Sequence, residues 1–308
     1  MQIIGTGAHC RYGEWEKTHP GMRTFTPNAV YHPPTDTVHV MWANGFATSN
    51  YSFEFLASTT HGQTWFTKAD SLPLRGSLLN AGDNGLLVAT GNGVVLSNGR
   101  IILMSMVWPD QGAYLVASDD AGSSFHLHPV GVNLKQSQEP QAVEIASGVF
   151  LRGRNPNHPH TVSSASISKD FGEHWTSIPL LQRGLRWPLD AASCAGGLAS
   201  TRPAWTNSTE PPKSDVMFFS HANDAQRKNG TVFRSVDGGQ RWEAVLQVTD
   251  ASDAADASYA YNALTTLAHE GQVTTLGNLY ETGDETKCTA GCSSCMIAYK
   301  PLELKDGA

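Results

Sequence analysis

Four octapeptides with hydroxyl and acidic side chains at fixed spacing are the first candidates for chemistry in this sequence. They read STTHGQTW, SDDAGSSF, SKDFGEHW and SVDGGQRW, and they begin at residues 58, 118, 168 and 235. Each has Ser first, Gly fifth and an aromatic residue eighth, and three have Asp third. Such an Asp could bind calcium or act in catalysis, or it could hydrogen-bond the backbone of its own turn while Gly supplies positive φ. Turn stabilisation is the favoured interpretation, because Thr60 replaces the Asp in one copy and Phe125 replaces the Trp in another.

A cluster of cysteines near the C-terminus is the second candidate. Cys288, Cys292 and Cys295 have C-x3-C-x2-C spacing, and the chain has five cysteines in all. This spacing can bind a metal ion, but no nearby His completes a site, and Cys10 and Cys194 are far away in the sequence. A disulfide or reduced thiols are therefore favoured, and no metal or other cofactor is predicted.

Composition excludes several classes of function. The formal net charge of −7 argues against nucleic acid as a partner. No apolar run reaches the roughly 18 residues of a membrane-spanning helix, and the first residues lack the pattern of a signal peptide. Asn50, Asn207 and Asn229 lie in sequons that would be glycosylated in a secreted or lysosome-like protein, so the compartment stays open.

The elements that must position any site are short β-strands. Runs such as TVHVMW, GRIILMSMV and TVFRS are separated by turn residues, and helical periodicity is nearly absent. The octapeptides follow one another at intervals of 60, 50 and 67 residues, which is typical of a β-propeller with one such turn in each blade. No linker divides the chain, so we predict a single domain over residues 1–308. Each octapeptide is expected in an equivalent hairpin on the outer rim, with its aromatic residue covering that hairpin.

Around these octapeptides the sequence resembles the exo-α-sialidase (neuraminidase) superfamily, in which such repeats are called Asp boxes. Four segments carry the resemblance in the family's order: NAVYHPPTDTVHVMW (28–42), GNGVVLSNGRIIL (91–103), QEPQAVEIASGVFLRGRN (138–155) and LYE (279–281). The resemblance covers about residues 25 to 300 and implies an all-β, six-bladed β-propeller whose first blade is incomplete here. It also implies hydrolysis of terminal sialic acid with retention and without a metal ion. The expected partner is a sialylated glycoconjugate or free sialic acid.

The resemblance further implies the catalytic pair. Tyr261 in YAYNALTTL matches the family's nucleophile segment, and Glu139 matches the glutamate that activates the nucleophile. A neutral tyrosine suits an anionic sugar, because a carboxylate nucleophile would meet charge repulsion. Tyr259, two residues before Tyr261, is the alternative nucleophile.

The residues that would bind the sugar carboxylate follow from the same resemblance. Arg154 and Arg227 match two of the family's three arginines, and Glu281 would orient the remaining arginine. Arginine offers a planar, bidentate match to a carboxylate that lysine does not. Arg152 and Arg234 are the alternatives to Arg154 and Arg227.

One departure from the family concerns the first blade. The family's opening Phe-Arg-Ile-Pro strand, with its first arginine, and the catalytic Asp that follows are not found, and Arg11 and Arg23 have a different context. We expect that the chain begins inside the first blade and that it is a poor sialidase as written. The alternative is an inactive sialidase-like propeller that binds glycans or proteins. The linkage preference, and the choice between hydrolysis and transfer, do not follow from the sequence.

Overall fold

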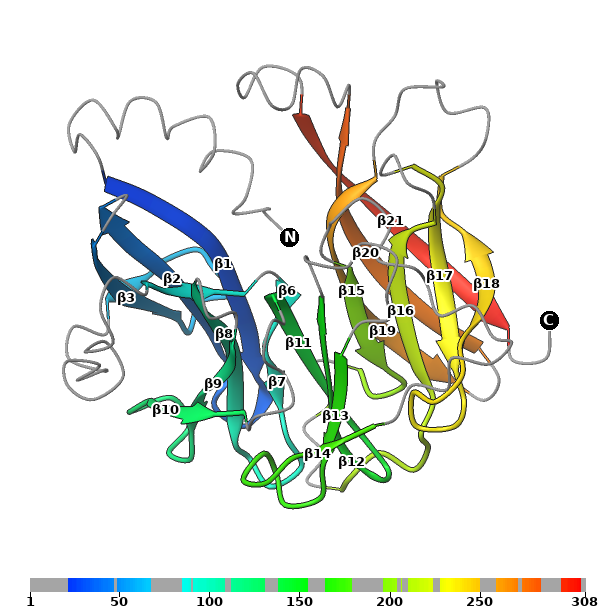
Figure 1. Cartoon of the computed structure of the whole chain (residues 1–308), viewed down its shortest axis with the longest axis horizontal. Coiled ribbons are helices and arrows are strands. Elements are labelled where there is room, and N and C mark those ends of the chain that lie inside the picture. Colours follow the sequence, from blue (N-terminus) through cyan, green and yellow to red (C-terminus); the bar gives the residue numbers. More distant parts are fainter. Residues whose placement is uncertain are drawn as a thin grey trace.

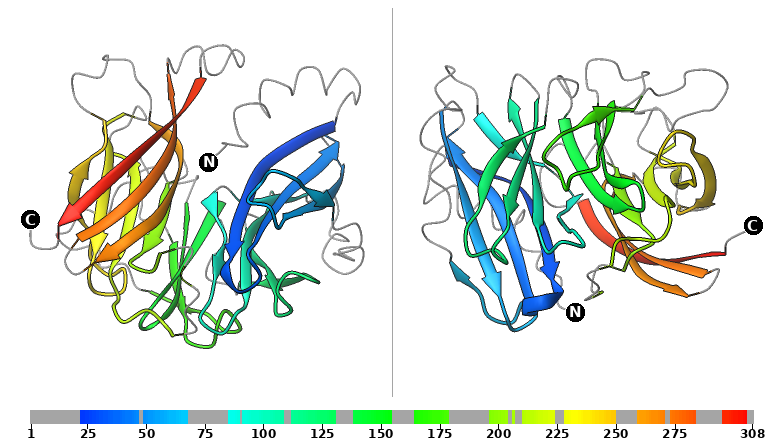
Figure 2. Two further views of the ribbon diagram at one scale, coloured as in Figure 1. Left: turned by 180° about the vertical axis from the view of Figure 1, so that it is seen from behind. Right: turned by 90° about the horizontal axis from the view of Figure 1, so that it is seen from below.

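The computed structural model of the chain is built from β-strands, which form five sheets in the part that it describes. The structure describes residues 22–46, 49–67, 85–89, 91–108, 112–130, 138–154, 164–178, 196–203, 206, 210–223, 228–249, 259–270, 273–283 and 295–305. Within these residues there is one short 3-10 helix, η1 (Pro33–Thr35), and no helix long and apolar enough to cross a membrane. Figures 1 and 2 show that the sheets follow one another around an arc, from β1 to β21.

Each sheet corresponds to one blade, whose strands run outward in sequence order, and the short strand β6 (Gly91–Asn92) is added to the inner edge of the first sheet beside β1. Blade 1 contains β1 (Met22–His32), β2 (Thr37–Phe46), β3 (Ser49–Ser58) and β4 (Phe66–Thr67). Blade 2 contains β5 (Gly85–Val88), β7 (Val94–Val95), β8 (Ile101–Trp108), β9 (Gly112–Ser118) and β10 (His126–Pro129). Blade 3 contains β11 (Gln138–Ile145), β12 (Gly148–Arg154), β13 (Ser164–Ser168) and β14 (Thr176–Ser177). Blade 4 contains β15 (Gly197–Ser200), β16 (Met217–Ala222), β17 (Gly230–Ser235) and β18 (Glu243–Gln247). Blade 5 contains β19 (Ala260–Glu270), β20 (Val273–Gly283) and β21 (Cys295–Lys305).

The expected β-propeller is confirmed, but the expectation of six blades is wrong for the part of the chain that the structure describes. That part forms five blades, and the first of them has four strands paired in order from β1 to β4. The octapeptide spacing already contains the physical reason. Successive copies are on average 59 residues apart, so 308 residues provide for about five blades of this size.

The core lies between consecutive blades, in four clusters of buried side chains. Neighbouring residues of one strand serve different clusters, because successive side chains point to opposite faces of a sheet. Ile101 and Leu103 pack toward blade 1, whereas Ile102 and Met104 pack toward blade 3. Both faces of the middle blades are therefore buried, which explains the continuous apolar run IILM in β8.

The four octapeptides occupy equivalent hairpins, as the sequence predicts. Each begins with the last residue of the next-to-last strand of a blade and leads into its outermost strand. The first Ser accepts a hydrogen bond from the backbone N–H of the fifth residue, for example Gly172 N to Ser168 Oγ at 2.8 Å. The indole of Trp175 donates to the carbonyl of the same glycine at 3.0 Å. The closing aromatic also extends beyond its own hairpin, because Trp175 packs against the cluster between blades 2 and 3.

The third residue of the octapeptide stabilises the turn. Asp170 Oδ1 accepts hydrogen bonds from Ser168 Oγ and from the backbone N–H of His174, each at 2.8 Å. The N–H of His174 favours the charged carboxylate most, and with the other hydrogen bonds it lowers the pKa of Asp170 to about 2 despite partial desolvation. Desolvation also opposes ionisation of Asp120, yet hydrogen bonds from Ser124 and Ser118 lower its pKa to about 2. The carboxylates of Asp120 and Asp170 therefore have a structural role in their turns.

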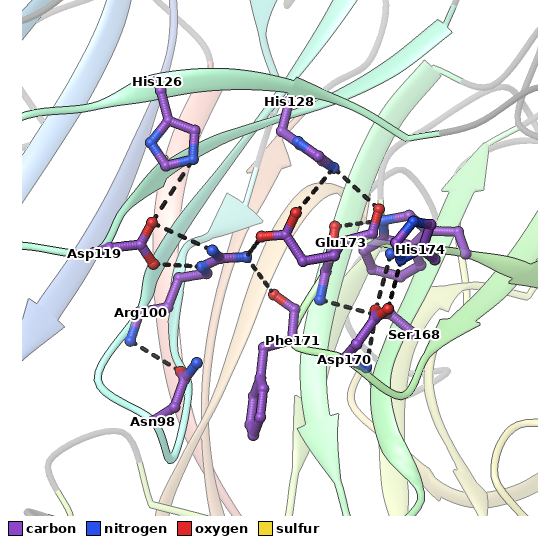
Figure 3. A network of polar contacts seen from close by, with 12 residues as sticks. Asn98, Arg100, Asp119, His126, His128, Ser168, Asp170, Phe171, Glu173 and His174 are labelled. Carbon is purple, nitrogen blue, oxygen red and sulfur yellow. Dashed lines mark hydrogen bonds and ion pairs between the residues drawn. The ribbon is translucent and has the colours of Figure 1, made fainter.

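Adjacent octapeptides are also linked across the boundary between blades 2 and 3 (Figure 3). Arg100, just before β8, donates from Nε to Asp119 at 2.6 Å and forms an ion pair with Glu173 at 2.5 Å. Its Nη1 also donates to the carbonyl oxygen of Phe171 at 3.0 Å. One mostly buried guanidinium thus ties the turn of blade 2 to the turn of blade 3.

Candidate active site

Three of the first strands of blades share an irregularity near their beginnings. In β1, β11 and β19 a register shift places two residues opposite one residue of the partner strand, which is a β-bulge. The shift falls between Phe25 and Asn28 in β1, between Gln138 and Gln141 in β11, and between Ala260 and Ala263 in β19. The first residue of the bulge is Thr26 in β1, Glu139 in β11 and Tyr261 in β19. The predicted base and the predicted nucleophile therefore hold equivalent positions in blades 3 and 5.

Thr26 is a residue that the sequence analysis did not identify. It holds in blade 1 the position that Glu139 holds in blade 3. A short internal repeat marks this equivalence, because TPNAV at residues 26–30 matches EPQAV at residues 139–143 in Pro, Ala and Val. The repeat was visible in the sequence, but its meaning depends on the cross-strand register.

The backbone of Glu139 is strained. Its φ is +48°, a left-handed conformation that residues other than glycine rarely adopt, and its side chain is half-buried. Pro140 follows directly, which further disfavours a helical backbone conformation at Glu139. Strained backbone of this kind costs about 1–3 kcal/mol and concentrates at functional sites. This conformation supports a functional role for Glu139.

The three bulges lie at the same end of the molecule. β1 pairs in parallel with β6 (Gly91–Asn92), with Asn28 opposite Gly91 and Ala29 opposite Asn92. β11 and β19 meet β6 at the same levels, because a Cβ on Gly91 would lie 2.5 Å from Gln141 Nε2, and Asn92 Nδ2 donates to Leu264 O at 3.1 Å. Figure 1 shows β1, β11 and β19 running in the same direction past β6, and in each strand the bulge precedes the residues that contact β6.

Pairing within each blade brings two more predicted residues close to the bulges. Arg154 on β12 pairs with Gln138, the neighbour of Glu139. Glu281 on β20 pairs with Ala260, the neighbour of Tyr261. The backbones of four predicted site residues thus lie at the same end of the molecule. Glu139 and Arg154 are there in blade 3, and Tyr261 and Glu281 are there in blade 5. The convergence of their side chains stays a prediction, and Arg227 lies outside the described residues.

The alternative tyrosine belongs to the core between blades 4 and 5. Tyr259 is fully buried, and its hydroxyl accepts a hydrogen bond from Asn278 Nδ2 at 2.7 Å and also pairs with Ser220 Oγ. The centroid of its ring lies 4.7 Å from the ring centroid of Tyr280. A hydroxyl engaged in the core in this way has a structural role, which favours Tyr261 as the nucleophile.

The alternative arginines also have structural surroundings. The guanidinium carbon of Arg152, a buried residue, lies 3.6 Å from the ring centroid of Phe219 in blade 4. Arg234 on β17 forms an ion pair with Glu243 on the outer strand β18 at 2.7 Å. Both contacts account for the arginines as parts of the scaffold, which favours Arg154 and Arg227 for the site.

Among the residues that the structure describes, no group of three or more His, Cys, Asp or Glu side chains is arranged to hold a metal ion. Four of the cysteines lie outside the described residues, and Cys295 begins β21. The structure therefore leaves the prediction about the cysteine cluster untested.

Comparison with known proteins supports the fold. No protein-family model and no curated protein sequence matches the chain. The Hadza microbial sialidase Hz136 superposes with a TM-score of 0.64 at 19% identity, over 92% of this chain and 53% of that one. A Trypanosoma rangeli sialidase mutant that displays trans-sialidase activity gives a TM-score of 0.62 at 14% identity, over 92% and 44%.

The NanB sialidase from Streptococcus pneumoniae gives a TM-score of 0.58 at 18% identity, over 83% of this chain and 36% of that one. The chain thus spans about half or less of the length of these structures.

Proposed function

We propose, on the basis of its sialidase-type β-propeller fold, that this chain is an exo-α-sialidase, which hydrolyses terminal sialic acid from glycoconjugates with retention of the anomeric configuration. One observation carries the proposal: the equivalent bulges of β11 and β19 present Glu139 and Tyr261 at one end of the molecule. Bulges re-aim side chains and are common next to active sites. Solved sialidases of the same fold in complex with sialic acid and with 2,3-difluorosialic acid support the choice of sugar.

In the proposed reaction Tyr261 is the nucleophile. Its hydroxyl oxygen attacks the anomeric carbon, and Glu139 accepts the hydroxyl proton. The leaving oxygen departs. Water then attacks the anomeric carbon and loses a proton to bulk water, while the Tyr261 oxygen leaves and takes back the proton held by Glu139, so that the configuration is retained after two displacements. Arg154 and Arg227 bind the sugar carboxylate, and Glu281 would orient the third arginine, which has no assigned residue in this sequence.

The proton donor to the leaving oxygen has no assigned residue in this sequence. A substrate whose leaving group is a stable phenolate needs no such donor, whereas a sialyl–galactose linkage does. We therefore expect turnover of 4-methylumbelliferyl sialoside to exceed that of sialyllactose by about 10²–10⁴-fold in kcat/KM, the usual contribution of general acid catalysis.

The test compares the wild-type chain with Tyr261→Phe and Glu139→Gln on 4-methylumbelliferyl sialoside. Tyr261→Phe should lower kcat by about 10³-fold or more, because it removes the nucleophile. Glu139→Gln should lower kcat by about 10²–10⁴-fold. Tyr299→Phe is the matched control, because Tyr299 is exposed on the outer strand β21. Retention is checked by following the anomer released first in a proton NMR time course.

The second candidate function is a sialoglycan-binding module. The observation that favours it is the missing assignment of both the acid and the third arginine. Calorimetric titration with sialic acid separates the two functions, because a binding module would bind the sugar without hydrolysing the sialoside. A chain that neither binds sialic acid nor hydrolyses the sialoside would contradict both proposals.

A further inference from the structure

The short strand β6 lies at the centre of the blades. It belongs to the segment between β5 and β7 of blade 2, yet it pairs with β1 of blade 1 and contacts β11, β15 and β19. Figure 1 shows β6 between β1 and β11, close to the middle of the arc. A strand of only two residues forms few backbone hydrogen bonds. Because β6 contacts four blades, we expect its main effect to be on the positions of the strands around it.

The contacts of β6 are specific and involve different blades. Asn28 Nδ2 of blade 1 donates to the carbonyl oxygen of Gly91 at 3.1 Å and to that of Ala89 at 3.2 Å. The side chain of Gln141 of blade 3 fills the space where a Cβ on Gly91 would lie. Asn92 Nδ2 donates to the carbonyl oxygen of Leu264 of blade 5 at 3.1 Å.

These contacts fall directly after the three bulges. Asn28 and Gln141 are the first residues back in register after the bulges of β1 and β11, and Leu264 is the second such residue in β19. A bulge interrupts the ladder of hydrogen bonds, so its position depends on the anchoring of the adjacent residues. β6 supplies these anchoring contacts from the centre of the blades.

We propose that β6 is a spacer that sets the positions of β11 and β19, and that Asn92 is a positioning residue for the pair Glu139 and Tyr261. Its role in catalysis rests on the proposed function. Because a misplacement of about 1 Å between reacting groups can cost about 10²-fold in rate, a small shift of either strand would be measurable.

Two substitutions with matched controls test the spacer. Asn92→Asp keeps the shape of the side chain, but it removes the N–H that donates to Leu264 and places a carboxylate against that carbonyl oxygen. Asn98→Asp makes the same change of charge at an exposed turn, where the side-chain oxygen still accepts from Arg100 N. Gly91→Ala would bring a Cβ within 2.5 Å of Gln141 at a φ of +111°. Gly99→Ala is its control, because the new alanine would likewise have to adopt a positive φ, +87°, but no atom lies within 4 Å of its Cβ.

The first readout is hydrogen–deuterium exchange, which does not depend on activity. Asn92→Asp should raise deuterium uptake in peptides that cover residues 259–264, and Gly91→Ala should raise it in peptides that cover residues 138–143. The two control variants should match the wild type there. Unchanged uptake in these peptides, or a rise of equal size across all blades, would overturn the spacer role.

The second readout is turnover of 4-methylumbelliferyl sialoside. Both β6 variants should lower kcat by about 10–100-fold with KM within a few-fold of the wild-type value, because they displace the catalytic pair. Raised local exchange with an unchanged kcat would overturn the positioning role of Asn92. A wild-type chain that does not turn over the sialoside would refute the proposed function, and the exchange data would still decide whether β6 is a spacer.

Discussion

Removing the indole of Trp242 tests the contribution of the octapeptide aromatic to the joint between two blades. Trp242 closes the octapeptide of blade 4 and is 4% exposed. Its ring centroid lies 6.4 Å from that of Phe150 in blade 3 and 6.1 Å from that of Phe219 in its own blade. The indole N–H donates to the carbonyl oxygen of Gly239 at 3.1 Å. Trp242→Ala would therefore open a cavity between blades 3 and 4 and leave that carbonyl without its partner.

The expected loss follows from these contacts. Truncation of a buried Trp to Ala costs about 3–5 kcal/mol of the free energy of unfolding. Trp242→Phe keeps most of the apolar area and loses a hydrogen bond, which contributes about 1 kcal/mol, so we expect a loss of about 1–2 kcal/mol. Phe125 fills the same octapeptide position in blade 2 and is likewise buried, which shows that this scaffold accommodates phenylalanine there. Trp65→Ala in blade 1 should cost less than Trp242→Ala, because Trp65 is only half-buried.

Urea unfolding followed by far-UV circular dichroism measures these losses without relying on tryptophan emission. At about 2 °C per kcal/mol for a large domain, the melting temperature of Trp242→Ala should fall by roughly 6–10 °C. Sialic acid binding by the folded variant should persist, since Trp242 lies in a hairpin of the outer strands. Equal losses at Trp242 and Trp65, or a loss below 1 kcal/mol for Trp242→Ala, would refute the assignment of this aromatic to the joint between blades.

Three further predictions concern the scaffold. The pKa of Asp170 is lowered to about 2, below its ordinary value of 3.8, so its stabilisation is present above about pH 4 and is lost as the pH falls toward 2. The melting temperature of Asp170→Asn should accordingly lie below that of the wild type at pH 6 and approach it at pH 2.5. Arg100→Gln should lower the free energy of unfolding by about 1 kcal/mol at low salt, and by less in 1 M NaCl, because Asp119 and Glu173 are partly exposed. Tyr259→Phe should lower the melting temperature while kcat on 4-methylumbelliferyl sialoside stays within a few-fold of the wild-type value, since its hydroxyl bonds within the core; a loss of kcat as large as that of Tyr261→Phe would reverse the assignment of the two tyrosines.

Local features of this protein could be predicted from the sequence. The octapeptide turn depends on contacts between residues two to four positions apart, such as those of Ser168 with Asp170 and Gly172. Eight residues therefore contain nearly all the information that the turn requires, and its equivalent place in four blades followed from repetition. The all-β class followed from strand and turn patterns in the same way.

Choices between neighbouring residues needed the tertiary structure. Tyr259 and Tyr261 have similar local sequence, but only the contacts of Tyr259 with Ser220 and Asn278 show that it belongs to the core. The contact of Arg152 with Phe219, a residue distant in the sequence, likewise shows that Arg152 takes part in the packing between blades 3 and 4. Such partners are decided by the packing of blade against blade, which no local pattern contains.

The equivalence of the bulges was also decided by tertiary structure. A bulge exists only relative to a partner strand, so the matching positions of Thr26, Glu139 and Tyr261 emerged from the pairing registers of β1, β11 and β19. The sequence by itself determined which residue types are present and which turns form. The long-range pairing around β6 decided which of them lie together at one end of the molecule, because that arrangement depends on contacts between strands more than 60 residues apart.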